Sequence, residues 1–306
     1  MAGRIGPDEL KQKLSSGLLS FPLTDFDQSG EFDPRGFRAR LDWLAQYPTS
    51  GQFIAGGAGE FFSLSQEEFR QTLRIAVEAR QGDRLVISAS GYGTRTASDL
   101  AVEAESSGAD GVLLLPPYLT EASQQGLFDH ILAICRSTRI GIIVYNRANC
   151  RLTAETLAKL AENCPNLVGL KDGQGDTEEF LRMRGKLGDR VVFINGMPTA
   201  EIHAQSYYGM GVPTYSSAIF NFIPEAALAF YDAVMRRDVP AIDAFMRDFL
   251  LPYSKIRSRQ PGYAVSIVKA GVTIAGRSAG KVRPPLSDLT EEEFADLKAL
   301  IDRVRH

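Results

Sequence analysis

The sequence contains few of the residues that build metal centres or disulfide frameworks. Its 306 residues include three cysteines and three histidines, namely Cys135, Cys150, Cys164, His130, His203 and His306. An odd number of cysteines without a CxxC pair is typical of buried thiols in a reducing compartment. The histidines are far apart and have no ligand partner at helical spacing, so no metal site is expected. The composition favours a mechanism without a metal or other cofactor.

Long apolar runs and an excess of basic charge are also missing. The formal net charge of −3 is spread over both signs, which argues against a nucleic-acid partner. No run approaches the ~20 apolar residues that span a bilayer, and residues 1–9 lack the apolar core of a signal peptide. We therefore expect a cytoplasmic protein that acts on a small molecule and binds neither nucleic acid nor a membrane.

Short apolar segments that have strand character recur at nearly regular spacing. Eight of them occupy residues 18–23, 52–55, 84–89, 111–115, 140–145, 167–171, 191–195 and 212–216. Most are continuous runs, which is typical of parallel strands buried on both faces. The amphipathic stretches between them predict helices at residues 33–45, 65–79, 95–106, 124–135, 153–162, 176–186 and 199–207.

This alternation favours an α/β fold of the (β/α)₈ TIM-barrel type over a doubly wound sheet, which has fewer strands and a GxGxxG turn. Gly56, Gly57 and Gly59 have the wrong spacing for that turn. From residue 224 onwards the pattern is wholly helical, with segments at 225–236, 239–250, 263–275 and 291–304. We expect a barrel over residues 1–223 that carries the catalytic site, and a helical region over residues 224–306 packed on it.

Lysine is scarce, with nine lysines among 34 basic residues, and Lys171 is unlike most of the others. It follows the apolar run 167–170 and precedes Asp172. Desolvation at the end of a buried strand lowers the pKa of a lysine from ~10.4, towards the range in which a neutral amine attacks a carbonyl. We interpret Lys171 as a candidate Schiff-base nucleophile. The alternative is a structural lysine paired with Asp172 or Glu178.

Polar residues follow the other strand segments, at the end of the barrel where TIM-barrel chemistry lies. Tyr145 ends the fifth segment, so neighbouring strands would direct its phenol and the amine of Lys171 into one pocket; the alternative is an aromatic filler. The segment Gly57-Ala58-Gly59 can offer backbone amides to a carboxylate, or can simply form a tight turn. Arg147 can bind a second carboxylate or lie on the surface.

Four further residues end the last two strand segments and can bond substrate hydroxyls. They are Asn195, Gly196, Ser216 and Ser217. Ordinary capping of loops is the alternative role for them.

The order and spacing of three motifs resemble a known superfamily. Gly-Gly-Ala-Gly-Glu at residues 56–60, Tyr145-Asn146-Arg147 and Lys171-Asp172-Gly173 are similar to the dihydrodipicolinate synthase and N-acetylneuraminate lyase superfamily of class I Schiff-base aldolases, over nearly the whole chain. The resemblance implies that Lys171 forms the iminium and that Tyr145 relays protons. It also implies a homotetramer built as a dimer of dimers, in which Tyr118 stands where an aromatic residue acts across a subunit interface.

Two features depart from the usual pattern. Gly57 and Ala58 stand where the superfamily usually carries hydroxyl residues, and Leu119 replaces a second tyrosine that is common in the synthases. The motifs are most similar to the decarboxylating dehydratase branch. This resemblance implies a cofactor-independent lyase of aldaric acid catabolism, which converts 5-dehydro-4-deoxyglucarate to 2,5-dioxopentanoate, water and carbon dioxide.

Three other functions are compatible with the same fold. The first is retro-aldol cleavage of a 2-keto-3-deoxy sugar acid with release of pyruvate, and the second is a synthase-like condensation. The third is a non-catalytic sensor of keto acids, which the pairing of Lys171 with Tyr145 argues against.

Overall fold

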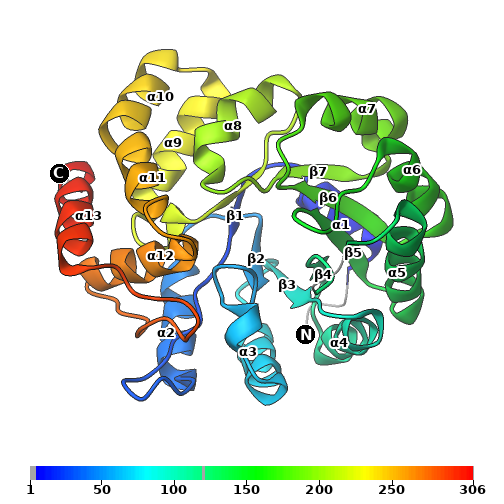
Figure 1. Cartoon of the computed structure of the whole chain (residues 1–306), viewed down its shortest axis with the longest axis horizontal. Coiled ribbons are helices and arrows are strands. Elements are labelled where there is room, and N and C mark those ends of the chain that lie inside the picture. The colour runs from blue at the N-terminus through cyan, green and yellow to red at the C-terminus, as the bar shows by residue number, and fades with distance from the viewer. Residues whose placement is uncertain (1–4, 119–120, 306) are drawn as a thin grey trace.

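Eight parallel strands form a closed barrel in the order in which they occur along the chain (Figure 1). The structure, a computed structural model, describes residues 5–118 and 121–305. The strands are β1 (Leu18–Ser20), β2 (Gly51–Ile54), β3 (Leu85–Ser90), β4 (Gly111–Leu114), β5 (Gly141–Asn146), β6 (Leu167–Asp172), β7 (Val192–Asn195) and β8 (Tyr215–Ser217). The expected TIM barrel is thus confirmed.

Helices follow the first seven strands and cover the outside of the barrel. They are α2 (Pro34–Leu44), α3 (Gln66–Glu78), α4 (Thr94–Ser107), α5 (Gln124–Ser137), α6 (Ala154–Asn163), α7 (Thr177–Leu187) and α8 (Ala200–Gly209). Their starts agree with the capping signals in the sequence, because Ser65 accepts a hydrogen bond from the amide of Glu68 and Thr153 accepts one from the amide of Thr156. None of the helices in the described part of the chain has the length and apolar character needed to cross a membrane.

The first and last strands are shorter than the apolar runs predict. β1 ends at Ser20, before Pro22, and β8 begins at Tyr215, after Pro213. Proline has no backbone N–H to donate to a sheet, so each proline lies outside the paired strand.

A short helix that the sequence analysis did not predict closes the bottom of the barrel. Helix α1 (Pro7–Lys13) lies behind β6 in Figure 1 and contacts β5 and β6. Leu10 and Leu14 are fully buried and belong to the apolar core inside the barrel. Gly111 and Gly141 make room for this plug, since a Cβ on either glycine would lie 2.6 Å from Leu10 Cδ2.

The C-terminal helices pack on one side of the barrel (Figure 1). They are α9 (Pro224–Arg236), α10 (Val239–Phe245), α11 (Leu251–Arg257), α12 (Tyr263–Ile274) and α13 (Glu291–Val304). The predicted helix at residues 239–250 differs in that its last part is a π-helical turn, Met246–Leu250, that leads directly into α11. Pro252 follows this turn and lacks the N–H of a regular α-helical bond, which explains the irregularity.

The C-terminal region shares its apolar core with the barrel. Leu18 of β1, Tyr215 of β8 and Ala204 of α8 belong to the same buried cluster as Phe249 and Val268. The helical region therefore rests directly on β1, β8 and α8 and is in contact with the loops at the barrel mouth.

We expect Leu10→Ala to destabilise the fold by about 2–5 kcal/mol, because it leaves a cavity in the apolar core inside the barrel. Urea denaturation followed by circular dichroism measures this change. Gln12→Ala, an exposed position on the same helix, is the matched control and should change the free energy of unfolding by less than about 0.5 kcal/mol. Equal effects of the two substitutions would show that α1 does not close the barrel.

Candidate active site

A β-bulge in β6 decides which way Lys171 points. The register between β5 and β6 shifts at Ile142 and Ile143, which leaves Val168 as an extra residue in β6. Beyond the bulge, Tyr145 and Lys171 are direct neighbours. In-register neighbours on parallel strands project to the same face, and Tyr145 belongs to the core inside the barrel. Lys171 therefore points into the barrel as well.

The amine of Lys171 lies among aromatic rings, with little access to water. Its Nζ is 3.9 Å from the ring centroid of Tyr145 and 4.5 Å from that of Phe21, and the residue is 5% exposed. Burial lowers the pKa of Lys171, a shift that Tyr145 opposes and the charge of Arg147 reinforces. A lysine in this state supplies a neutral amine at lower pH than a free lysine does.

The structure does not support the alternative of a structural ion pair for Lys171. Glu178 pairs with Arg182 on the surface of α7, and the carboxylate of Asp172 accepts a hydrogen bond from Tyr207 of α8. Lys171 takes part in none of the ion pairs formed among residues 5–118 and 121–305.

Tyr145 is held in place at its hydroxyl. Its Oη donates a hydrogen bond to the carbonyl of Gly196 over 2.8 Å and accepts one from Nη1 of Arg147 over 2.9 Å. Burial alone would raise the pKa of Tyr145, but the charges of Lys171 and Arg147 outweigh burial and lower it. The phenol is therefore easier to ionise than a free tyrosine, which suits a group that removes and returns a proton.

Two glycines give the reactive side chains room. A Cβ on Gly196 would lie 2.9 Å from Lys171 Cε, and a Cβ on Gly173 would lie 2.8 Å from Tyr145 Cε2. A larger residue at either position would displace the amine or the phenol. Gly196 is thus required by the packing around Lys171, and Gly173 by the packing around Tyr145.

A second polar group supports the ends of β5 and β6 from behind, and sequence analysis did not identify it. Asp172 points away from the barrel interior, where it accepts hydrogen bonds from Tyr207 Oη and, over 3.2 Å, from Asn146 Nδ2. Asn146 Oδ1 accepts a bond from the amide of Leu152 over 2.9 Å. The position of Asp172 next to Lys171 was the one available signal, because Tyr207 lies in an ordinary helical pattern.

The segment 56–59, here called the glycine loop, follows β2. Within the described residues, the amides of Gly57, Ala58 and Gly59 donate no hydrogen bond, so three successive donors are available. Gly57 is exposed and a Cβ there would meet nothing within 4 Å. Ala58 packs against the core inside the barrel, which includes Tyr145. Free amides in one turn can bind an anion.

Strand parity separates the remaining polar residues of β7 and β8 into two groups. Ser216 is an in-register neighbour of Leu19, which lies in the core inside the barrel, so its hydroxyl faces inwards. Ser217 faces outwards and donates to Glu201 Oε1 over 2.6 Å. Asn195 also faces outwards, where its side chain bonds the carbonyl of Ala200 and the amide of Met197. The structure does not bring Asn195 and Ser217 into the group around Lys171.

Tyr118 lies apart from this group. It follows β4 and is 69% exposed, so its ring is available at the surface. Leu119, the neighbouring position considered in the sequence, lies outside the described residues.

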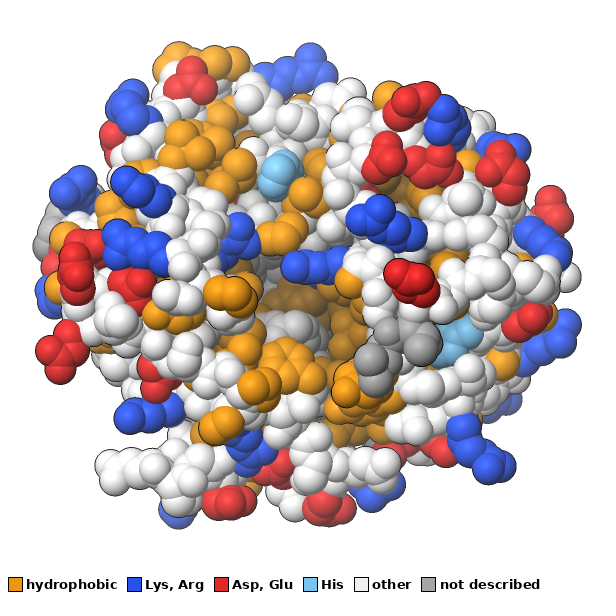
Figure 2. Space-filling model, viewed as in Figure 1, with side chains coloured by type: hydrophobic (Ala, Val, Ile, Leu, Met, Phe, Trp, Pro, Cys, Tyr) orange, Lys and Arg blue, Asp and Glu red, His pale blue; other side chains and the backbone are white. Residues whose placement is uncertain are grey.

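Figure 2 shows that the face in view is hollowed at its centre and that hydrophobic side chains line part of the hollow.

Two expectations about cysteine and metal ligands concern the rest of the chain. Cys135, Cys150 and Cys164 are free and buried, as expected, and burial raises the pKa of Cys150 to about 12. Among the residues that the structure describes, no three His, Cys, Asp or Glu side chains are grouped so that they could hold a metal ion.

Comparison with known proteins agrees with this geometry. The model of the family described as "Dihydrodipicolinate synthetase family" matches residues 14–304. The chain belongs to this family.

Relatives in this family carry a more specific name. A protein of Bradyrhizobium diazoefficiens named "Probable 5-dehydro-4-deoxyglucarate dehydratase" is 54% identical over 301 residues, which cover 98% of this chain and 96% of that protein. A protein of Pseudomonas putida with the same name is 53% identical over 300 residues, which cover 98% and 99%.

Solved structures of this family share the fold. Dihydrodipicolinate synthase from Oceanobacillus iheyensis superposes with a TM-score of 0.89 at 24% identity, and covers 98% of this chain and 99% of that one. The enzyme from Bacillus clausii superposes with a TM-score of 0.88 at 25% identity, and covers 97% and 100%. The likeness to these synthases establishes the barrel and its C-terminal helices.

We expect Lys171→Met to abolish turnover and to make the folded protein more stable. The unfolded state binds more protons than the folded state between the lowered pKa of Lys171 and the free value of ~10.4, so wild-type stability rises with pH across that window. The gain from Lys171→Met should therefore be largest below the window and should disappear as the pH approaches its upper end. A gain of ~1 kcal/mol corresponds to roughly 2–4 °C in melting temperature.

Thermal melts of both proteins at several pH values measure this difference. Lys255→Met, at an exposed position of α11, is the matched control and should change neither turnover nor the pH profile of stability. A Lys171→Met protein less stable than wild type at every pH would contradict the interpretation of Lys171 as a desolvated amine with a lowered pKa.

We expect Arg147→Met to raise the pKa of Tyr145, because it removes both a charge and a hydrogen bond from the phenol. The acidic limb of the pH–rate profile should move to higher pH, and kcat should fall about tenfold or more. Arg151→Met, at an exposed position of the following loop, should leave the profile unchanged. An unshifted profile in Arg147→Met would mean that Arg147 does not act through Tyr145.

Proposed function

We propose that this chain is a 5-dehydro-4-deoxyglucarate dehydratase, a lyase that forms 2,5-dioxopentanoate, water and carbon dioxide through a Schiff base on Lys171. The observation that carries the proposal is the contact of the buried amine of Lys171 with the ring of Tyr145, at in-register positions of β6 and β5. The names of the relatives at 53% and 54% identity support the choice of substrate.

The reaction begins when the neutral amine of Lys171 attacks the ketone beside one carboxylate of the substrate. Water leaves and an iminium forms, which draws electrons from the neighbouring carbon. Because burial lowers the pKa of Lys171, a larger fraction of the amine is neutral near physiological pH.

Tyr145 then removes a proton from the carbon next to the iminium. The electron pair of that C–H bond moves to the iminium nitrogen and gives an enamine. The enamine expels the hydroxyl on the next carbon, and Tyr145 returns its proton to the leaving oxygen so that water forms. Arg147 stabilises the phenolate in the interval, since it already donates to the phenol oxygen.

Loss of carbon dioxide uses the same electron sink. Dehydration leaves a double bond conjugated with the iminium. When the bond to the distal carboxylate breaks, carbon dioxide leaves and the electron pair moves along the conjugated chain to the nitrogen. The enol that results becomes the aldehyde, and hydrolysis frees the product and Lys171. These reaction steps consume no electrons from an external donor, so the reaction needs no redox cofactor.

The surrounding groups hold the substrate in the direction that this chemistry requires. The free amides of Gly57, Ala58 and Gly59 bind the carboxylate beside the ketone, which the product retains. Arg147 also meets the distal carboxylate. The inward hydroxyl of Ser216 and the backbone of Gly196 bond the hydroxyls of the chain.

Three residues that the sequence predicts for the site act at longer range in this proposal. Asn195 and Ser217 hold the backbone behind the site through their outward bonds. Tyr118 presents an exposed ring to a neighbouring subunit in a homotetramer built as a dimer of dimers. We place the enzyme in the cytoplasm, where it acts in the breakdown of aldaric acids.

Two other reactions use the same pair of residues. Retro-aldol cleavage of a 2-keto-3-deoxy sugar acid would release pyruvate, and a synthase-like condensation would consume it. Neither produces carbon dioxide. A sensor of keto acids would bind substrate and release no product.

We expect borohydride added during turnover of 5-dehydro-4-deoxyglucarate to trap one adduct, on Lys171, and the untreated reaction to release one carbon dioxide for each 2,5-dioxopentanoate. One adduct is expected because the mechanism forms its only covalent bond to the substrate at Lys171. Since the iminium supplies the electron sink that a metal ion would otherwise provide, removal of metal ions with EDTA should leave turnover unchanged. Peptide mapping by mass spectrometry locates the adduct. An adduct on another lysine would refute the assignment of the nucleophile, and pyruvate as product would favour the aldolase.

A further inference from the structure

Glu60 follows the glycine loop directly, and its carboxylate has partners in the C-terminal region. Glu60 is fully buried. Its Oε1 lies 2.9 Å from Nζ of Lys269 in α12, and its Oε2 accepts a hydrogen bond from the backbone N–H of Arg283 over 3.3 Å. Within the described residues, neither carboxylate oxygen has a partner in the barrel.

Glu60 needs this support because its backbone is in a conformation that side-chain-bearing residues rarely adopt. Its φ of 53° and ψ of 43° lie in the left-handed region. The chain turns at this residue from the glycine loop into the short helix η1 (Phe61–Ser63). A conformation of this kind persists only where the surroundings hold it.

A displacement of Glu60 would pass directly into the glycine loop. A Cβ on Gly59 would lie 2.9 Å from Ala55 Cα and 3.1 Å from the carbonyl oxygen of Pro22, so Gly59 is closely packed between backbones. The carbonyl of Gly59 also accepts a hydrogen bond from Thr24 Oγ1 over 2.8 Å. Gly59 is therefore a rigid link between Glu60 and the free amides of Gly57 and Ala58, which would change direction with it.

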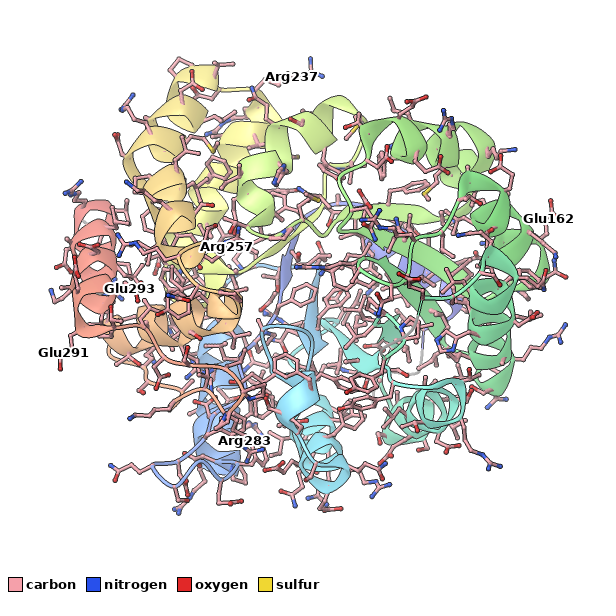
Figure 3. All side chains as sticks on the ribbon, viewed as in Figure 1. Glu162, Arg237, Arg257, Arg283, Glu291 and Glu293 are labelled. Atoms are coloured by element: carbon pink, nitrogen blue, oxygen red, sulfur yellow. The ribbon has the colours of Figure 1, made fainter. Side chains whose placement is uncertain are left out.

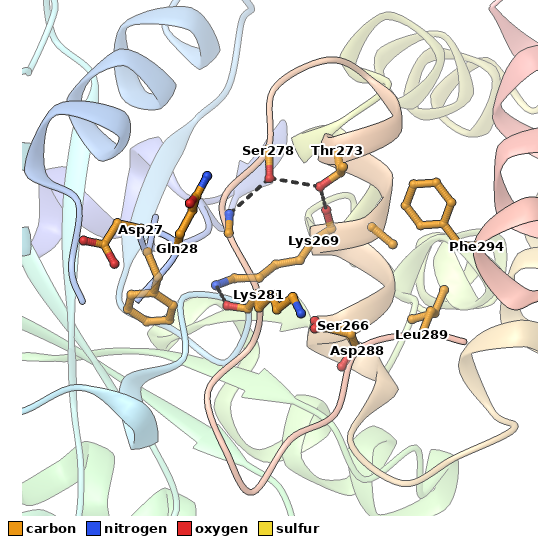
Figure 4. A pocket seen from close by; sticks show the side chains of 13 residues that line it. Asp27, Gln28, Ser266, Lys269, Thr273, Ser278, Lys281, Asp288, Leu289 and Phe294 are labelled. Atoms are coloured by element: carbon orange, nitrogen blue, oxygen red, sulfur yellow. Dashed lines mark hydrogen bonds between the residues drawn. The ribbon is translucent and has the colours of Figure 1, made fainter. Parts of the chain in front are cut away.

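Among residues 5–118 and 121–305, Lys269 is the one residue that forms an ion pair with the carboxylate of Glu60. It is 2% exposed, and its Nζ also donates to the carbonyl of Lys281 over 2.9 Å and lies 4.0 Å from the ring centroid of Phe26. Figure 4 shows its side chain extending from α12 toward Lys281. Burial lowers the pKa of Lys269, and Glu60 acts in the opposite direction.

We propose that Lys269 is a positioning residue for the carboxylate site, and that its ion pair with Glu60 sets the direction in which the amides of the glycine loop point. Helix α12 thereby controls the affinity of the enzyme for the carboxylate of a 2-keto acid. The inference rests on the proposed function, because it takes the glycine loop to be the site that receives that carboxylate.

Two features make a substitution at Lys269 informative. A cavity of about 620 Å³ runs beside its side chain, so a methionine can be accommodated there (Figure 4). The C-terminal region also has a second attachment, because the guanidinium of Arg283 pairs with Glu68 of α3 and bonds the carbonyl of Ser63. Figure 3 shows Arg283 close to α2 and α3. Loss of the Lys269 pair should therefore disturb Glu60 without detaching the region.

The test compares pyruvate with its methyl ester, which carries the same ketone without the negative charge. The full-length enzyme is incubated with each compound, the adduct on Lys171 is trapped with borohydride, and the concentration for half-maximal labelling is measured by mass spectrometry. Lys269→Met should raise that concentration about tenfold or more for pyruvate, because the loop amides that receive its negative charge lose their alignment, and should change it less than about twofold for methyl pyruvate.

Lys281→Met is the matched control, since Lys281 lines the same cavity and is exposed, whereas the Glu60 carboxylate pairs with Lys269 and the backbone of Arg283. It should match wild type with both compounds. If Lys269→Met does not fold, Glu60→Gln carries the test and should likewise weaken pyruvate selectively. Equal weakening of both compounds, or no weakening of pyruvate, would overturn the positioning role alone. If neither pyruvate nor 5-dehydro-4-deoxyglucarate labels Lys171 in the wild type, the proposed function is overturned, and this inference with it.

Discussion

The burial of a single amine is the constraint on which the rest of the site depends. A lysine removed from water is costly when charged, and it is useful here because the cost favours its neutral form. That state requires a closed, dry environment. The parallel barrel supplies apolar walls, α1 closes the bottom, and Phe21 and Tyr145 cover the amine with their rings. Gly173 and Gly196 leave the space that the side chains of Tyr145 and Lys171 occupy.

Side chains alternate between the two faces of a strand, and this divides the polar residues into those inside the barrel and those that face the helices. Tyr145, Lys171 and Ser216 face inwards, while Asp172 and Asn195 face outwards and bond to the helical layer. The hydrogen bonds of Asp172 and Asn195 hold the strand ends in position. Because these side chains face outwards, the carboxylate of Asp172 does not lie next to the amine of Lys171. The barrel thus keeps the carboxylate of Asp172 one residue from Lys171, the proposed nucleophile, and on the opposite face of the sheet.

The parts of this arrangement that could be predicted from the sequence are those encoded locally. Continuous apolar runs indicated the strands, and the position of Lys171 at the end of one indicated the amine. The parity of Asn195 and Ser217 could not be predicted, since a run of polar residues at a strand end does not reveal which face each one takes. Some contacts join segments that are distant in the chain, so no local sequence pattern predicts them. Examples are the ion pair of Lys269 with Glu60 and the packing of Leu10 beside Gly111. Helix α1 is short and has few apolar positions, which is why periodicity missed it.

The bulge at Val168 determines which face of the sheet Lys171 takes, so the strand register decides whether the amine lies inside the barrel. Regular pairing continued from Leu167 would put Leu170 beside Tyr145 and turn Lys171 to the outer face, next to Asn146. Such a register isomer would keep its strands and most of its helices, and would have an aliphatic side chain where the nucleophile belongs. The observed register keeps Leu170 in the apolar layer under the helices, whereas the alternative would move it to the barrel interior. A spectroscopic measure of folding therefore cannot distinguish an active barrel from an inert one, and only the reactivity of the amine reports which register the strand has taken.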